Sequence, residues 1–266
     1  MACDSGVIVA CDFKQEWLLP WWWRHYQSHN DYPVVFVDFG MSKEGRRWCR
    51  ERGILIEIPS LQIPLTEDLS NAKRKAGEER YGPGIGNVRS AWLKKPLALL
   101  QFPFEYGLWL DLDCQVRKNL EPIFQGLYLG FEIAVVKDRE QNFDFMLPSE
   151  IHYNSGVIAF RKGSFLQKFA DSLIQWKDQL PGDQEILSRA IFLHKPALLK
   201  LPATYNWFFP WGANDEASIF HYCGGEGKLA ILDSFVPADI DSSLVSGYSQ
   251  YTVSKVFGVS ADVKAP

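Results

Sequence analysis

Residues 106–113 read YGLWLDLD, a mostly apolar run that leads straight into two acidic residues. The apolar part, residues 106–110, predicts a buried strand of an α/β sheet. Ligands of such sheets bind beyond the carboxyl ends of the strands, which is where Asp111 and Asp113 would lie. The spacing alone fits a pair of solvated carboxylates equally well. A buried strand that ends in two acids is, however, an arrangement that stability does not require.

The Asp-x-Asp pattern offers two hard oxygen ligands to one ion. If the chain turns after Asp111, the carboxylates of Asp111 and Asp113 can face the same ion. Mg²⁺ and Mn²⁺ prefer oxygen ligands of this kind and also bind phosphate oxygens. The stretch therefore predicts a divalent metal site that holds a phosphorylated ligand.

The rest of the chain alternates expected strands and helices. The expected strands are residues 7–11, 33–38, 54–58, 133–136 and 156–160, and the expected helices are residues 16–29, 42–52, 90–100 and 164–179. This alternation predicts an α/β fold with a central, mostly parallel sheet flanked by helices. Residues 60–86 lose the periodicity and are expected to form a loop or lid. We expect one domain over residues 1–236 and a C-terminal tail or packing segment over residues 237–266.

Composition excludes several functions. The net charge is −4 and the pI is near 5.8, which argues against a general electrostatic grip on nucleic acid. Five cysteines without a Cys-x-x-Cys pair predict neither a disulfide framework nor a thiolate zinc site, so we expect a reducing, cytoplasmic location. No stretch approaches the roughly 20 apolar residues of a transmembrane helix.

Aromatic residues gather in two places, residues 17–23 and residues 205–211. We expect packing against the following strand for at least half of the first cluster. Peripheral contact with a membrane surface, an acceptor or a partner stays open for the others. The second cluster suits stacking on sugar rings.

Three further stretches carry groups suited to a sugar phosphate. His221 ends an expected strand and leads into the glycines and lysine of residues 223–228, which suit a metal and a phosphate; a hydrogen-bonded histidine and a turn are the simpler interpretation. Asn-Ser-Gly at residues 154–156 suits sugar hydroxyls, although in isolation it indicates a turn. Asp183 follows Pro-Gly and is expected to cap a helix.

The order of these motifs resembles family 8 of the GT-A glycosyltransferases, whose members are typically retaining and use nucleotide-sugar donors with Mn²⁺. The resemblance spans roughly residues 7–228. It is carried by a first strand that ends near Asp12, LDLD at residues 110–113, YNSG at residues 153–156, GDQE at residues 182–185 and HYCG at residues 221–224. It implies the GT-A fold and a hexosyltransferase that uses a UDP-sugar. The acceptor would be a carbohydrate, a lipid-linked glycan or a protein.

The same resemblance implies a role for individual residues. Asp111, Asp113 and His221 would bind the Mn²⁺ or Mg²⁺ ion, and Asn154, Asp183 and Gln184 would surround the transferred sugar. Residues implied to bind the nucleotide part of the donor are Ala10, Cys11, Asp12, Leu112, Ser155, Gly224 and Lys228. Lys228 stands four residues after Gly224, whereas the family usually has three and a following Pro-Trp. Arg89 and Lys94 or Lys95 are therefore further candidates for the diphosphate.

Gln184 would be a poor nucleophile, which favours front-face attack by the acceptor hydroxyl over a covalent intermediate. Gln184 would then stabilise the cationic sugar or place the acceptor, and Asp183 would bind sugar hydroxyls. Two alternatives stay open. One is a sugar nucleotidyltransferase, although the basic Gly-rich signature of that class is missing after the first strand. The other is a nucleotide-sugar-binding module without turnover.

Overall fold

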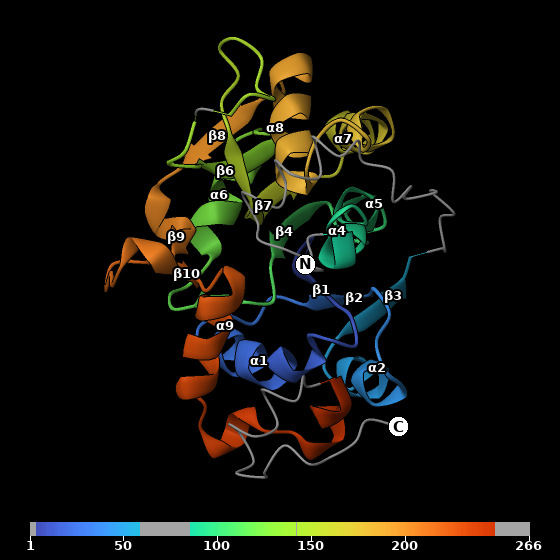
Figure 1. The fold of residues 1–266 in the computed structure, drawn as a ribbon, viewed down its shortest axis with the longest axis vertical. Coiled ribbons are helices and arrows are strands. Elements are labelled where there is room, and N and C mark those ends of the chain that lie inside the picture. The colour runs from blue at the N-terminus through green and yellow to red at the C-terminus, as the bar shows by residue number, and fades with distance from the viewer. Residues whose placement is uncertain (1–3, 59–85, 142, 248–266) are drawn as a thin grey trace.

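A seven-stranded sheet forms the centre of the computed structural model, which describes residues 4–58, 86–141 and 143–247 (Figure 1). In spatial order its strands are β3 (Ile54–Glu57), β2 (Val34–Asp38), β1 (Ser5–Cys11), β4 (Tyr106–Leu110), β7 (Tyr153–Arg161), β6 (Ile133–Lys137) and β8 (Leu198–Leu201). Neighbouring strands are parallel except at β7, which runs antiparallel to both β4 and β6. A smaller sheet has the order β5 (Cys114–Val116), β10 (Ile219–His221) and β9 (Trp207–Phe208). The predicted α/β class is confirmed.

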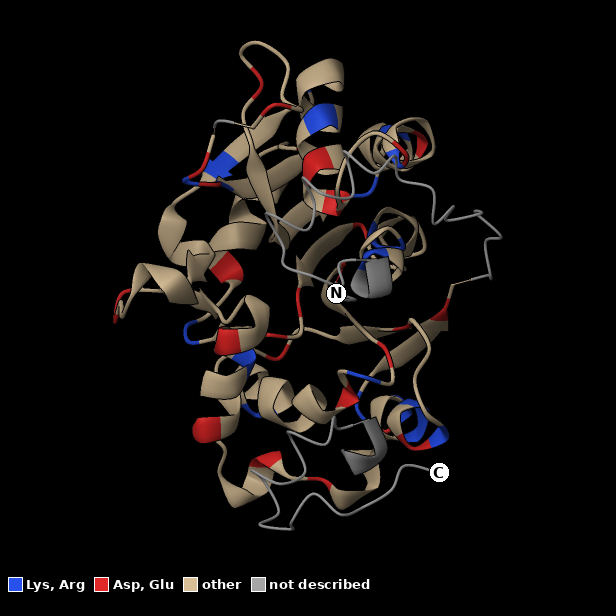
Figure 2. Cartoon of the chain, in the orientation of Figure 1, with Lys and Arg blue, Asp and Glu red and all other residues tan. Residues whose placement is uncertain are grey.

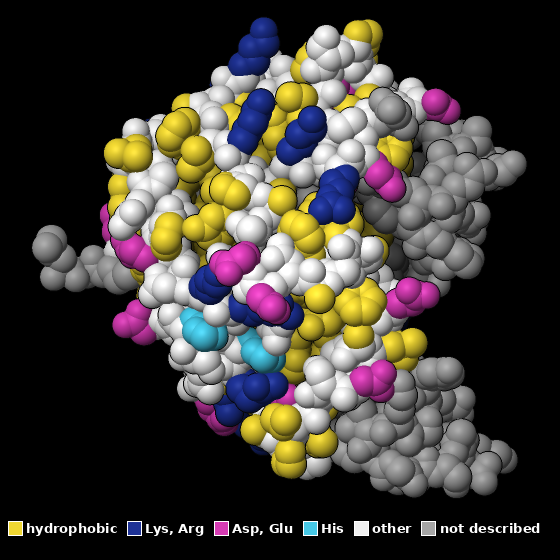
Figure 3. All heavy atoms as spheres, turned by 90° about the vertical axis from the view of Figure 1, so that its left-hand side faces the viewer, with side chains coloured by type: hydrophobic (Ala, Val, Ile, Leu, Met, Phe, Trp, Pro, Cys, Tyr) yellow, Lys and Arg dark blue, Asp and Glu magenta, His cyan; other side chains and the backbone are white. Residues whose placement is uncertain are grey.

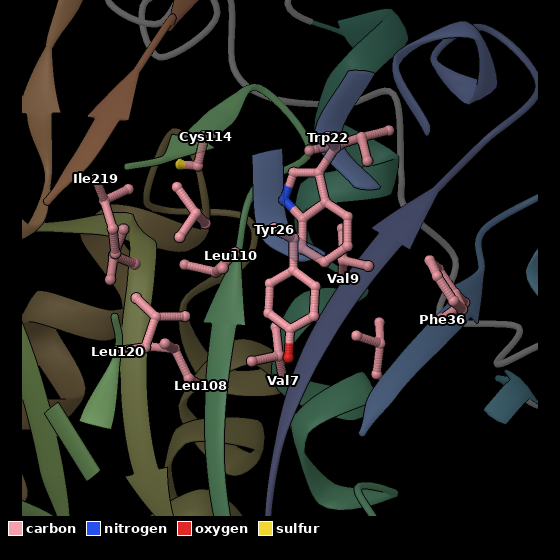
Figure 4. Close-up of a cluster of buried hydrophobic side chains, with 14 of the residues drawn as sticks. Val7, Val9, Trp22, Tyr26, Phe36, Leu108, Leu110, Cys114, Leu120 and Ile219 are labelled. Carbon is pink, nitrogen blue, oxygen red and sulfur yellow. The ribbon is translucent and has the colours of Figure 1, made fainter. Parts of the chain in front are cut away.

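Helices cover both faces of the large sheet. One layer contains α1 (Leu19–Gln27), α2 (Lys43–Arg50) and α6 (Glu121–Tyr128), and the other contains α5 (Lys95–Leu100), α7 (Ser164–Trp176) and α8 (Asp183–His194). Because successive strand residues face opposite sides, Val7 and Val9 pack in the first layer and Ile8 in the second. Figure 4 shows the first layer, where apolar strand residues lie against the rings of α1. This alternation explains why the strands read as continuous apolar runs.

Three sequence expectations differ from the observed elements. The helix expected over residues 90–100 is two helices, α4 (Gly86–Trp92) and α5, because Pro96 lies in the first turn of α5, where its missing N–H is tolerated. Asn-Ser-Gly at residues 154–156 lies inside β7 rather than in a turn, since β7 pairs with β6 as far back as Tyr153. The Gly-rich stretch after Cys223 is helical, the start of α9 (Gly224–Asp233). The predicted lid falls almost wholly on residues 59–85, outside the described residues.

The first aromatic cluster is mainly core. Trp17, Trp21 and Trp22 are buried, and Trp22 stacks on Tyr26 with ring centroids 5.1 Å apart. Trp23 is half-buried and still packs against Trp48. Trp22 and Trp23 lie against Phe36 of the following strand, β2, so the expected packing is confirmed for two of the four tryptophans, whereas Trp17 and Trp21 pack against Phe235 and Tyr222.

The first part of the expected C-terminal tail is packed on α1. Residues 237–247 form two short 3-10 segments, Pro237–Asp239 and Ser242–Gly247. The carboxylate of Asp239 is fully buried and binds the guanidinium of Arg24 through contacts of 2.5 and 2.9 Å. Leu244 is buried in the core. Residues 248–266 lie outside the described residues.

Charged residues are dispersed over the described surface. Figure 2 shows Lys and Arg interspersed with Asp and Glu on separate elements. None of the described helices has the length and apolar character needed to cross a membrane.

Truncation of Trp22 should test whether this core carries the fold. We expect Trp22→Ala to lower the free energy of unfolding by about 3–5 kcal/mol, because a fully buried ring is removed and a cavity remains. Urea denaturation followed by circular dichroism measures this change. Leu129→Ala is the control, since that side chain is 82% exposed and its loss should change stability by no more than about 0.5 kcal/mol. Equal effects of the two substitutions would contradict the assignment of residues 17–23 to the core.

Candidate active site

The two sheets meet directly after β4, at the Asp-x-Asp sequence. From Asp113 the chain enters β5 without a loop, and β5 pairs with β10 so that Cys114 lies opposite His221. The backbone N–H of Tyr222 also donates to the carbonyl oxygen of Asp113 at 2.9 Å. Backbone pairing thus holds His221 against Asp113, although the two residues are far apart in the sequence.

The imidazole of His221 faces both acids. Its Nε2 lies 3.2 Å from Oδ1 of Asp113 and 4.0 Å from Oδ2 of Asp111. Asp113 and His221 are buried, whereas the side chain of Asp111 is 30% exposed. The three predicted metal ligands are therefore together, and Asp111 gives the group an opening to solvent.

The other oxygen of each carboxylate is held by a donor. Oδ2 of Asp113 lies 2.7 Å from Nζ of Lys228. Oδ1 of Asp111 accepts from Nε1 of Trp109 at 2.7 Å and lies 3.1 Å from Nζ of Lys95. Each acid consequently directs its second oxygen towards Nε2 of His221.

Neighbouring side chains keep the carboxylate of Asp113 ionised. Burial alone would raise the pKa of Asp113, but Lys228 and His221 hold the pKa of that carboxyl well below its usual range. Burial would likewise lower the pKa of Lys228, and the charge of Asp113 raises it instead. The pair is therefore charged over the whole physiological pH range.

This donor set fits a divalent cation. Two carboxylate oxygens and an imidazole nitrogen converge, and hard ions such as Mn²⁺ and Mg²⁺ accept such ligands. Ligand atoms of Asp113, Cys114 and His221 all lie within 4.8 Å of one another. Cys114 is the weaker ligand of the three, because burial raises the pKa of its thiol well above the usual value and a metal needs the thiolate. Asp111, with its free Oδ2, is the better third ligand.

A second group of polar residues lies beside the acids, around a buried lysine. Nζ of Lys95 lies 2.7 Å from Oδ2 of Asp183 and donates to the carbonyl oxygen of Ser155 at 2.9 Å. Burial opposes the charge of Lys95, but Asp111 and Asp183 raise its pKa. Burial raises the pKa of Asp183, and Lys95 partly offsets this. Asp183 was expected to cap α8; Gly182 occupies the N-cap instead, and Asp183 serves as the partner of Lys95.

The amides of Asn154 and Gln184 are also part of this group. Nδ2 of Asn154 donates to Oε1 of Gln184 at 2.5 Å, and both residues are buried. The predicted sugar-side residues are thus in contact with one another, and Asp183 links them to Asp111 through Lys95.

Of the other predicted donor-binding residues, some lie at the ligand-binding edge of the sheet and others lie in the core. Ala10 is half-exposed near the end of β1, and because Ile8 lies opposite Trp109, β1 and β4 end at the same edge of the sheet. Oδ1 of Asp12 accepts from the backbone N–H groups of Lys14 and Gln15, and so closes the turn after β1.

Cys11 and Leu112 point into the core. Gly224 starts α9 with a φ of 78°, a left-handed conformation that favours glycine.

Two of the predicted basic residues are engaged elsewhere. The guanidinium of Arg89 donates to the carbonyl oxygens of Lys177, Leu180 and Pro181, and Nζ of Lys94 donates to that of Phe39 at 3.1 Å. Lys95 and Lys228 are the lysines that reach the acids. Helix α5 starts at Lys95, with Lys94 at its N-cap, and Lys95 is buried whereas Lys94 is half-buried.

Sequence reasoning missed two residues of the site, Asn206 and Asp138. Nε2 of Gln184 donates to Oδ2 of Asp138 at 3.1 Å, and Oδ1 of Asn206 lies 3.0 Å from Nδ1 of His221. Asp138 directly follows an apolar strand, the same signal that drew attention to Asp111. Asn206 carries no local signal, since it lies between two short elements.

The second aromatic cluster lies next to His221. The ring of Phe208 meets that of His221 edge-on, with centroids 5.3 Å apart. Trp211 stacks on Phe208, and the guanidinium of Arg139 lies 3.9 Å from the centroid of Trp211. Figure 3 shows the side of the molecule that carries β8, β9 and α9, where apolar side chains gather beside basic ones. These rings are half-buried and form one wall beside the candidate metal ligands.

Gly156 makes room for His221, which gives a direct test of the site. A methyl group on Gly156 would lie 2.7 Å from Nδ1 of His221 and would also clash with Cε1. We expect Gly156→Ala to displace the imidazole, to weaken Mn²⁺ binding measured by calorimetry, and to cost about 1–3 kcal/mol of stability. Gly225→Ala is the control, because nothing lies within 4 Å of the added group. Unchanged Mn²⁺ affinity in Gly156→Ala would show that His221 is not a ligand.

Comparison with known proteins finds solved structures of similar fold but no protein of similar sequence. No protein-family model matches this sequence, and neither does any curated protein. Among solved structures, the galactosyltransferase LgtC in complex with donor and acceptor sugar analogues is 14% identical, with a TM-score of 0.60 over 98% of this chain and 97% of that chain. Mouse xyloside xylosyltransferase 1 is 15% identical, with a TM-score of 0.52 over 82% of this chain and 97% of that chain. GlyE of Streptococcus pneumoniae is 17% identical, with a TM-score of 0.52 over 83% of this chain and 55% of that chain. The chain has the GT-A fold of the glycosyltransferases.

Proposed function

We propose that this chain is a metal-dependent glycosyltransferase that transfers a hexose from a nucleotide sugar, with a UDP-sugar as the expected donor. The acceptor would be a carbohydrate, a lipid-linked glycan or a protein. The observation that carries the proposal is the convergence of Asp111, Asp113 and His221 at the edge of the sheet where ligands of α/β folds bind. The structurally similar LgtC, which was solved with donor and acceptor sugar analogues, supports it by analogy.

Asp111, Asp113 and His221 would hold the ion, Mn²⁺ or Mg²⁺. The ion, when bound, would offset the negative charge that develops on the leaving nucleoside diphosphate. Nζ of Lys228 lies 2.7 Å from Oδ2 of Asp113, one of these three side chains. Its ammonium would add a second positive charge on the leaving-group side.

The sugar side has neutral amides rather than a free carboxylate. Both polar atoms of the Gln184 side chain are engaged, since Oε1 accepts from Asn154 and from the backbone N–H of Ser155 while Nε2 donates to Asp138. An amide held in this way is a poor nucleophile, which supports front-face attack by the acceptor with retention. Another structure of LgtC carries a glutamine-to-glutamate change in its active site, and Gln184 is the glutamine we propose for the corresponding task here. Oδ2 of Asp183 is paired with Nζ of Lys95. Asp183 would therefore bind sugar hydroxyls while it keeps its ion pair with Lys95.

The half-buried rings of Phe208 and Trp211 are suited to bind the acceptor. Aromatic faces bind the C–H faces of sugar rings, and these rings lie directly beside His221. We therefore place the acceptor along the β9 side of the metal ligands.

Release of nucleoside diphosphate tests the proposal. We expect one member of a panel of nucleotide sugars to be cleaved when Mn²⁺ is present and to be stable after chelation. Asp113→Asn should lower the rate by about 100-fold or more, because one charged ligand is lost. Glu216→Gln is the control, since that carboxylate pairs with Lys118 on the surface and lies outside the group.

Three other outcomes would redirect the proposal. Metal-dependent donor binding without turnover with any acceptor would indicate a binding module. Release of pyrophosphate from a nucleoside triphosphate and a sugar phosphate would indicate a nucleotidyltransferase. Neither binding nor cleavage of any nucleotide sugar would overturn the proposal.

A further inference from the structure

A fully buried histidine, His152, lies between two buried acids behind the sugar-side amides. Its Nδ1 lies 3.6 Å from Oδ2 of Asp138, which directly follows β6, and its Nε2 lies 3.4 Å from Oε1 of Glu185, in the first turn of α8. The backbone N–H of Asp138 also donates to the carbonyl oxygen of His152 at 3.0 Å. Both ring nitrogens therefore face carboxyl oxygens that separate elements of the fold hold in place.

Aromatic rings and a closed ion pair lie on the other sides of this histidine. The ring of Phe143 meets that of His152 edge-on, with centroids 5.1 Å apart, and Phe145 lies 6.3 Å away. Arg189, further along α8, is paired with Glu150 at 3.0 Å. The charges of that pair balance each other, so Asp138 and Glu185 are the described acids that act on the imidazole directly.

The surroundings of both acids favour their charged forms. Oδ1 of Asp138 accepts from the backbone N–H of Glu140 at 3.2 Å, and Oδ2 accepts from Nε2 of Gln184 at 3.1 Å. Hydrogen bonds donated to both oxygens stabilise a carboxylate. Glu185 lies in the field of the buried guanidinium of Arg89, on α4: burial lowers the pKa of Arg89, and the charge of Glu185 opposes this.

A doubly protonated ring is the form that suits both neighbours. A carboxylate can only accept, so a ring nitrogen that faces one must donate. Neutral imidazole has a single N–H and would direct the lone pair of its other nitrogen at a carboxylate. Imidazolium has two N–H groups and supplies a positive charge between two buried negative ones. Burial opposes that charge, but both acids lie within the roughly 4–6 Å at which an opposite charge favours it.

We propose that His152 is a positioning residue that stays doubly protonated and holds Asp138 as the carboxylate to which Gln184 is anchored. Oε1 of Gln184 accepts from the backbone N–H of Ser155, so Nε2 is the end of that amide that reaches Asp138. Loss of the imidazolium charge would leave two buried carboxylates around a neutral ring. A buried carboxylate that loses a charged partner takes up a proton or moves towards water, and either change would loosen Gln184.

The charge can be measured on the metal-free protein without any donor. ¹⁵N NMR should show His152 with two N–H groups at about pH 7.5, where an ordinary histidine is roughly 90% neutral. The chain has five histidines, and the signal of His152 is assigned by its absence in His152→Gln or, if that variant does not fold, by its contacts with the ring protons of Phe143. The side-chain NH₂ signal of Gln184 should shift at the same pH at which His152 loses a proton.

Glu185→Gln tests the charge from the side of the ring that faces away from Asp138. Removal of one carboxylate makes the imidazolium less favourable, so we expect His152 to lose its proton at a pH lower by about 1 unit or more. The shift of the Gln184 signal should move down with it. Glu16→Gln is the matched control, because Glu16 is also a fully buried glutamate and accepts from the backbone N–H of Ser42; neither signal should move.

The effect on turnover rests on the proposed function, whereas the charge of His152 and its effect on Gln184 do not. The rate of nucleoside diphosphate release should fall above the pH at which His152 loses its proton. In Glu185→Gln this fall should begin at a pH lower by the same amount as the NMR titration.

The outcomes separate this inference from the proposed function. A neutral His152 at about pH 7.5 would overturn the inference, and so would a titration of His152 that is the same in Glu185→Gln as in the wild type. A Gln184 signal that does not follow His152 would show that His152 does not position the amide. If no nucleotide sugar is cleaved while both NMR signals titrate together, the proposed function fails and the inference stands.

Discussion

The antiparallel pairing of β5 with β10 is the constraint on which the candidate site depends. It places His221 opposite Cys114, directly after the second acid of the Asp-x-Asp sequence. Without this pairing Asp111 and Asp113 would end a strand with no third ligand. The same small sheet brings β9, and with it Phe208, alongside His221. One set of backbone hydrogen bonds thus brings the candidate metal ligands and the aromatic wall together.

The buried polar residues around this pairing are partners of one another. Lys95 joins the two acids Asp111 and Asp183, and the amide of Gln184 joins Asn154 to Asp138. Such a network is costly to bury if any member lacks a partner, and it holds its members in one arrangement when all are paired. Among the described residues of the site, the side chains of Asp111 and Lys228 are the ones with substantial exposure, 30% and 29%.

The sequence predicts those parts of the fold and site that depend on local chemistry. Strands β1, β2 and β4 are visible because they are buried on both faces, and Asp111 and Asp113 are visible because acids rarely follow such a strand without reason. Asn206 is not visible, since its importance comes from an oxygen that faces His221 across two chain segments. The same limit applies to Lys94 and Lys95: the sequence places both near the acids, and only the structure shows that Lys95 is the one that contacts Asp111 and Asp183. For Asp183 the local pattern was misleading. An acid after Pro-Gly is a common helix cap, and this pattern gives no sign of the ion pair that Asp183 makes with Lys95.

The β5–β10 pairing also sets the order in which the site can come into being. On the ribosome, His221 is made roughly 100 residues after Asp113, a delay on the order of 5–20 s at ordinary rates of translation. During that interval β4 and its two acids can already belong to a folded sheet, but the nascent chain lacks both the imidazole of His221 and the side chain of Asn206 that contacts it. A cation coordinated by all three side chains would therefore bind late in biogenesis, after the central sheet has formed.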